Sequence, residues 1–157
     1  RKPAPPPPAP AASEEIGREM TLTGTVMVVG RAPYEKVMVL PVDPRLAGVE
    51  ARGEWREEIR AASGARITVE GSIVEPGRMR VARYTIVSVD GKPALIGVLE
   101  SRDGGLYLNV KGEGESRQVR IEPIPEGLSG RAGAKVWVVL GADGAVEAYG
   151  ILREPGS

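Results

Sequence analysis

The run GARITV at residues 64–69 returns later in the chain as GAKVWV at residues 133–138. In each run a Gly-Ala pair precedes β-branched or aromatic residues, which is typical of a strand that begins after a tight turn. A second pair of runs, VARYTI at residues 81–86 and VEAYGI at residues 146–151, also matches. The sequence therefore predicts two copies of one β-rich unit, related by duplication.

The first copy contains five predicted strands, separated by Gly- and Pro-containing stretches that favour turns. Between the third and fourth strands, Trp55, Ile59 and Ala62 recur at helical spacing and form one apolar stripe. This stripe predicts a short helix over residues 53–63. The predicted strands are residues 20–29, 36–42, 49–52, 66–74 and 79–89.

The second copy repeats this plan in a shorter form, and Gly97 takes the place of Gly24. Its helix is reduced to about one turn near residues 126–131, while Asp-Gly pairs at residues 103–104 and 143–144 predict tight hairpins. Its first three predicted strands are residues 94–101, 106–110 and 118–122.

The order of three strands, a helix and two strands resembles the OB fold, a five-stranded and partly open barrel. An SH3-like barrel is the alternative that element order leaves open. The resemblance implies an all-β protein of two tandem small five-stranded OB-like barrels, with a short helix in the first and a proline-rich extended N-terminal tail. The expected boundaries are residues 1–18 for the tail, 19–90 for the first barrel and 91–157 for the second.

Six prolines dominate the start of the chain. Because proline fixes φ and lacks a backbone donor, they predict an extended polyproline II segment, which is either a spacer or a ligand. Proline-rich ligands dock in apolar, aromatic-lined grooves. We therefore expect the segment to contact a neighbouring copy through Pro3, Pro5, Pro6, Pro7, Pro8 and Pro10.

The chain begins with Arg1 and Lys2 rather than Met, so we expect either a processed N-terminus or a trimmed chain, with an export or lipoprotein signal already removed. The tail resembles the spacers that follow the acylated cysteine of bacterial lipoproteins. A lipid anchor is expected only if a cysteine preceded Arg1, and the expected location is secreted, cell-surface or periplasmic. No stretch approaches the roughly 20 apolar residues of a membrane-spanning helix, so no transmembrane segment is predicted.

The composition excludes several classes of function. Twenty-one basic residues balance twenty-one acidic ones, so no general attraction to nucleic acid or anionic membranes is expected. The chain has no His and no Cys, and serine triads, thiolate nucleophiles and the common zinc sites therefore cannot be assembled. Its four Asp residues lie beside turns without calcium-loop spacing. We predict no catalytic residue, metal or cofactor, and a protein that is not an enzyme.

Only one Asn, Asn109, and one Gln, Gln118, occur in the chain. The near absence of these labile side chains, together with abundant Glu, Arg and Pro, is typical of a thermophile protein. A GC-rich genome would favour a similar composition, and the two explanations stay open.

Arg78, Arg80 and Arg83 form the densest basic group. Arg78 and Arg80 alternate onto one strand face, where they are candidates for contact with an anion or a partner. A strand edge protected by charge is the alternative. Few rings are available to stack on bases, and we interpret as barrel core the aromatic residues Trp55, Tyr84, Trp137 and Tyr149.

These observations predict a non-catalytic extracytoplasmic structural or assembly protein. In this hypothesis the protein is a homopolymer subunit of a filament or surface layer, and its proline-rich tail docks on a neighbouring copy. Such head-to-tail contacts generate rings or open filaments. The alternatives are a lipid-anchored or secreted ligand-binding module that uses a barrel face and, more distantly, a single-stranded nucleic-acid-binding protein.

Overall fold

The computed structural model describes residues 16–112 and 115–156 of the chain. It is an all-β structure with two small barrel-like units, which divide between Tyr84 and Thr85. The proline-rich segment of the predicted tail lies outside the described residues.

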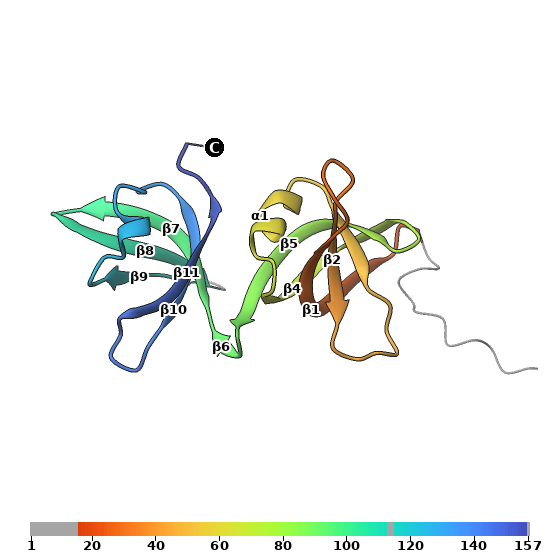
Figure 1. The fold of residues 1–157 in the computed structure, drawn as a ribbon, viewed down its shortest axis with the longest axis horizontal. Helices are drawn as coiled ribbons and strands as arrows, with labels where there is room; N and C mark the ends of the chain where they lie inside the picture. Colours follow the sequence, from red (N-terminus) through yellow and green to blue (C-terminus); the bar gives the residue numbers. More distant parts are fainter. Residues whose placement is uncertain (1–15, 113–114, 157) are drawn as a thin grey trace, which may run out of the picture. The chain divides into compact units, whose positions relative to one another are not determined.

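Five strands and one helix build the first unit (Figure 1). The elements are β1 (Glu19–Val29), β2 (Lys36–Pro41), β3 (Val49–Arg52), α1 (Arg56–Ala61), β4 (Arg66–Glu75) and β5 (Arg78–Val89). Neighbouring strands pair in the order β3-β2-β1-β4-β5, and β3 also pairs in parallel with β5. This last pairing closes the sheet into an OB-like barrel, and the helix falls between the third and fourth strands as expected.

Alternation along the strands separates the core of the first unit from its surface. On β1, Leu22 and Val26 are buried, whereas Thr21 and Thr23 face solvent. A buried aliphatic side chain of this kind contributes about 1.5–3 kcal/mol to stability. The six residues of α1 are too few to form a stable helix alone, so the full burial of Ile59 against the barrel holds it in place.

The second unit has the same strand order in a smaller form (Figure 1). It begins within the last part of β5, where Ser88 and Val89 pair with the short β6 (Lys92–Pro93). The other elements are β7 (Leu95–Arg102), β8 (Gly105–Gly112), β9 (Glu115–Ile121), the 3-10 turn η2 (Glu126–Leu128), β10 (Lys135–Leu140) and β11 (Val146–Arg153). The strands are ordered β11-β10-β7-β8-β9, and Leu128 of η2 is fully buried in the core, as Ile59 is in the first unit.

The matched runs of the two copies occupy equivalent places. Gly24 on β1 pairs with Ile67 on β4, and Gly97 on β7 pairs with Val136 on β10. Equivalent backbone hydrogen bonds flank these pairs, from Val26 to Ala65 (3.0 Å) and from Leu99 to Ala134 (2.9 Å). The predicted equivalence of Gly24 and Gly97 is therefore confirmed.

The same close approach of two strands requires both glycines. A Cβ atom on Gly24 would lie 2.4 Å from the carbonyl oxygen of Leu40, and one on Gly97 would lie 2.2 Å from that of Asn109. Both distances are far below normal contact, so any side chain would force the first and second strands of the unit apart.

Closure distinguishes the two units. In the first, Glu50, Ala51 and Arg52 of β3 pair with residues 78–80 of β5. Among the described residues of the second unit, no such pairing joins β9 to β11. If Tyr84 is aligned with Tyr149, the closing residues of β5 correspond to residues 143–145, which form the hairpin turn before β11. The shorter hairpin thus lacks the segment that closes the first barrel.

Candidate functional site

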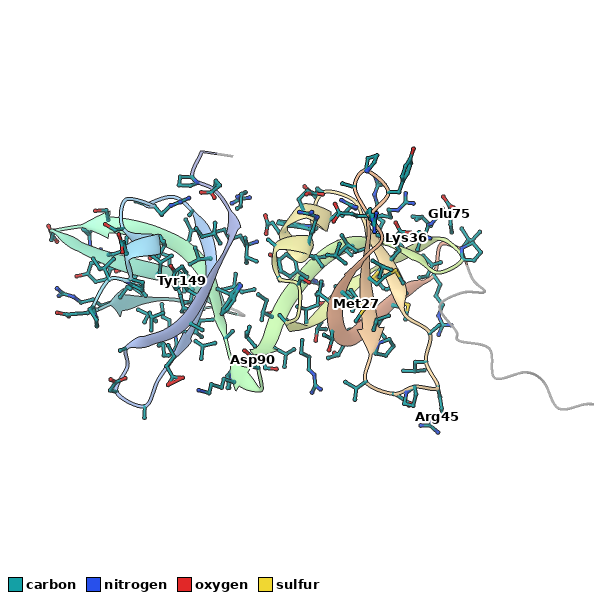
Figure 2. The ribbon with its side chains drawn as sticks, viewed as in Figure 1. Met27, Lys36, Arg45, Glu75, Asp90 and Tyr149 are labelled. Atoms are coloured by element: carbon teal, nitrogen blue, oxygen red, sulfur yellow. The ribbon has the colours of Figure 1, made fainter. Side chains whose placement is uncertain are left out.

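An apolar surface covers the outer side of the β1–β2 hairpin. Met27 on β1 pairs with Met38 on β2, and Val29 and Leu40 lie on the same side of the sheet. Met27, within β1, and Val29, at its end, expose 49% and 45% of their surface. We call these four residues the apolar face, and Figure 2 shows Met27 on this hairpin together with Lys36.

The loop between β1 and β2 adds an exposed ring to the same hairpin. Tyr34 in this loop is 84% exposed, the most exposed of the large hydrophobic side chains in the described part of the chain. An exposed apolar surface rimmed by polar groups is typical of a protein interaction site. The hairpin therefore presents an exposed ring in its loop and two methionines on its strands, and methionine adapts its shape to different partners.

A ladder of ion pairs borders the apolar face along the seam of the barrel. The carboxylate of Glu50, which is almost fully buried, accepts hydrogen bonds from Nε of Arg52 at 3.0 Å and Nε of Arg78 at 3.2 Å. Arg78 also donates to Glu75. Since a buried carboxylate is costly unless paired, these contacts stabilise the strands that close the barrel.

The structure does not gather the three predicted arginines at one anion site. Arg78 belongs to the ladder, and Nε of Arg83 lies 3.1 Å from a carboxylate oxygen of Glu70. Arg80 lines a shallow hollow of about 310 Å³ together with Glu54. The alternative prediction was that these arginines protect an exposed strand edge. It is wrong at Arg78 and Arg80, because β5 pairs with β3 on one side and with β4 on the other.

The aromatic residues assigned to the barrel core lie at its periphery instead. Trp55 is half-buried, meets Tyr84 edge to face at 6.0 Å between centroids, and donates from Nε1 to the carbonyl of Ala82. Trp137 lies on the outer side of β10 over Gly150, and Tyr149 (Figure 2) packs on Gly127 of η2. Aliphatic residues fill the cores because inward strand positions in such narrow barrels leave little room for rings.

A polar surface of the second unit was missed by sequence reasoning. Glu100 on β7, Tyr107 and Asn109 on β8, and Gln118 on β9 share the outer side of the sheet. By register from the two matched glycines, this surface corresponds to the apolar face of the first unit. The lone Asn and Gln were visible in the composition, but only the β8–β9 register places them side by side.

The clear pKa shifts of the chain belong to exposed surface pairs away from both surfaces. Hydrogen bonds from the side chain and backbone of Arg45 lower the pKa of Asp43, and the same pairing raises the pKa of Arg45. A hydrogen bond to Glu147 raises the pKa of Lys92. Pairs of this kind contribute little to stability.

Comparison with protein-family models and with curated proteins yields no match. Across residues 16–112 and 115–156, no helix is long and apolar enough to cross a membrane. In the same residues, no three acidic side chains gather closely enough to hold a metal ion.

Proposed function

We propose that this chain is a non-catalytic assembly protein that acts outside the cytoplasm, and that its apolar face binds the proline-rich segment of a neighbouring copy. The observation that carries the proposal is the exposed Met27–Met38 pair with its neighbours Val29 and Leu40. At the corresponding positions of the second unit the same fold carries polar side chains, so the fold itself does not require an apolar surface there.

The chemistry of residues 3–10 suits this surface. A polyproline II segment loses little conformational entropy when it docks, and its rings pack well on apolar and aromatic side chains. It has few N–H groups but many carbonyl acceptors. Tyr34 at the loop, and Lys36, Arg52 and Arg78 beside the face, offer donors for those carbonyls.

The position of the face favours binding between copies. The proline-rich segment leads into β1 near Glu19, whereas Met27 lies eight residues further along the strand, or about 26 Å away. For residues 3–10 to reach the face of their own copy, the chain before Glu19 would have to double back along β1. Docking on the next copy is a heterologous contact, which produces rings or open filaments.

The location outside the cytoplasm rests on the tail, whose composition is similar to the spacers of bacterial lipoproteins. A ligand-binding module with a passive spacer is the competing proposal. The two proposals differ in one measurable respect. The ligand-binding module is expected to be a monomer both with and without residues 1–13.

The test compares the full chain, a chain that begins at Glu14, and two variants by light scattering and negative-stain microscopy at matched concentration. Met27→Glu places a charge in the apolar face and should abolish assembly as the truncation does. Val74→Glu is the matched control, because Val74 is also an exposed apolar residue of the first unit but lies on β4, away from the face. It should assemble like the unaltered chain.

A synthetic peptide of residues 1–13 supplies a second readout. It should bind the truncated chain, shift the amide signals of β1 and β2, and fail to bind the Met27→Glu variant. Monomers from every chain, or assembly that survives the truncation, would contradict the proposal.

A further inference from the structure

The only Asn and the only Gln of the chain are hydrogen-bonded to each other on the outer side of the second unit. Gln118 donates from Nε2 to Oδ1 of Asn109 at 2.8 Å, and Asn109 donates from Nδ2 to Oε1 of Glu100 at 2.9 Å. Arg102 donates to Oε1 of Gln118 at 2.5 Å. We call these four residues and Tyr107 the amide face. A chain that otherwise avoids amides thus concentrates both of them in one network.

The ring of Tyr107 contacts Arg102 of the amide face and its neighbour Arg120 on β9. The guanidinium carbon of Arg102 lies 4.9 Å from the ring centroid of Tyr107, and that of Arg120 lies 5.9 Å from it. Both distances are within the range of a cation–π interaction. Side chains that are already held in place lose less entropy when a ligand binds, so the face is preorganised.

The network leaves hydrogen-bonding groups available on its solvent side. Each amide has two N–H donors, a guanidinium has five, and a carboxylate accepts on two oxygens. The bonds among these side chains use one N–H of Asn109 and one oxygen of Glu100, while the other N–H and the other oxygen have no described partner. Arg102 likewise retains several donors. Donors and acceptors therefore alternate over a short distance.

The charges of the amide face cancel. Glu100 and Arg102 carry opposite charges, and Nε of Arg120 lies 3.2 Å from a carboxylate oxygen of Glu122. A neutral surface gives no affinity for a phosphate backbone, whose binding depends on unbalanced cations. It suits a neutral ligand with several closely spaced groups that both donate and accept, and adjacent hydroxyl groups have this property.

We propose that the amide face binds a neutral oligosaccharide. Gln118 uses both of its N–H groups within the network, since Nε2 also lies 3.4 Å from Oε1 of Glu100. Adjacent hydroxyls of a sugar would donate to the free oxygen of Glu100 and accept from the second N–H of Asn109 and from Arg102. A site that spans three neighbouring strands fits an extended chain better than a single small sugar. This site is on the second unit and does not depend on docking of the proline-rich segment on the first.

The two amides also provide the test. The ¹⁵N-labelled full chain has only two side-chain NH₂ groups from Asn and Gln, so each can be assigned from a single variant. Neutral hexasaccharides of glucose, mannose, xylose or N-acetylglucosamine are added separately while the ¹H–¹⁵N spectrum is recorded. At least one should shift both NH₂ signals saturably, with a Kd of about 1 mM or tighter.

Matched variants separate binding from folding. Gln118→Ala should weaken binding about tenfold, because Asn109, Glu100 and Arg102 each lose the partner that orients them. Gln118→Glu keeps an acceptor for Arg102 but removes the N–H groups that bond to Asn109 and Glu100, and it should also weaken binding. Thr23→Ala removes an exposed Thr–Thr hydrogen bond of 2.7 Å in the first unit and should leave binding unchanged. The backbone spectrum reports whether each variant is folded.

Two results would overturn the proposal. One is that no hexasaccharide moves either NH₂ signal, or that one does so equally in the Gln118→Ala variant. The other is that a thymidine octanucleotide binds the face in low salt and is released at higher salt, which would identify a nucleic-acid surface instead.

Discussion

The two units share one register but present opposite chemistry on corresponding outer surfaces. Met27 of the first unit corresponds to Glu100 of the second, Met38 to Tyr107, and Leu40 to Asn109. Inward positions of both units remain aliphatic. Core packing therefore constrains the inner side of such a sheet, because only inward side chains contribute to the core. Side chains on the outer side are free to differ between the two units and to take on separate roles.

The largest effect is expected at the glycines that the two units share. Gly97→Ala would place a methyl group against the Asn109 carbonyl and should destabilise the second unit by about 3 kcal/mol, and Gly24→Ala should do the same to the first. Thermal unfolding can be followed separately through Trp55 and Trp137, one in each unit, in variants that keep a single Trp. If either substitution lowered the stability of both units equally, the two glycines would not act separately within their own units.

Gly77→Ala is the matched control for these substitutions. Gly77 has a φ of 76° but no atom within 4 Å of its added Cβ, so only backbone strain opposes the change. It should cost about 1 kcal/mol. A cost as large as that of Gly24→Ala would mean that close approach is not the cause.

A smaller effect is expected at the barrel seam, the β3–β5 pairing that, among the described residues, the first unit alone has. Glu50→Gln keeps the shape of the side chain but removes the charge that Arg52 and Arg78 share. We expect a loss of about 1–2 kcal/mol, after allowing for the partial exposure of both arginines. Hydrogen exchange should become faster at the β3–β5 pairing and stay unchanged in β7–β11. If hydrogen exchange became faster by the same factor throughout the first unit, the β3–β5 seam would not be a separate structural element.

The smallest effects come from the two equivalent tyrosines. The Tyr84 hydroxyl donates to Glu58 at 2.7 Å, whereas position 127, the counterpart of Glu58, is a glycine beneath the Tyr149 ring. Tyr84→Phe should therefore cost about 1 kcal/mol, because it leaves a largely buried carboxylate without this donor. Tyr149→Phe should change stability by less than about 0.5 kcal/mol. Denaturant unfolding of the two variants measures the difference, and similar values would contradict the assigned role of Glu58.

Much of the fold could be predicted from the chain. Strand periodicity, the Asp-Gly hairpins and the apolar stripe of Trp55, Ile59 and Ala62 are local signals, and they predicted the strands and the short helix. The aromatic residues were assigned wrongly to the core, because hydrophobic character does not reveal which side of a strand, or of a helix end such as Trp55, faces inward. Neither surface was predicted, since each depends on which outward residues are neighbours across strands.

The sequence by itself determined the two-copy, all-β architecture, since alternation and turn chemistry depend on residues close together in the chain. It also determined the absence of His and Cys chemistry. The three-dimensional structure was needed to show that β3 pairs with β5 in the first unit, whereas no described residues of the second unit pair β9 with β11. It was also needed to show that Met27 meets Met38 while Asn109 meets Gln118. Those outcomes depend on strand register and hairpin length, which bring together residues that are distant in sequence, and no local pattern encodes such pairings.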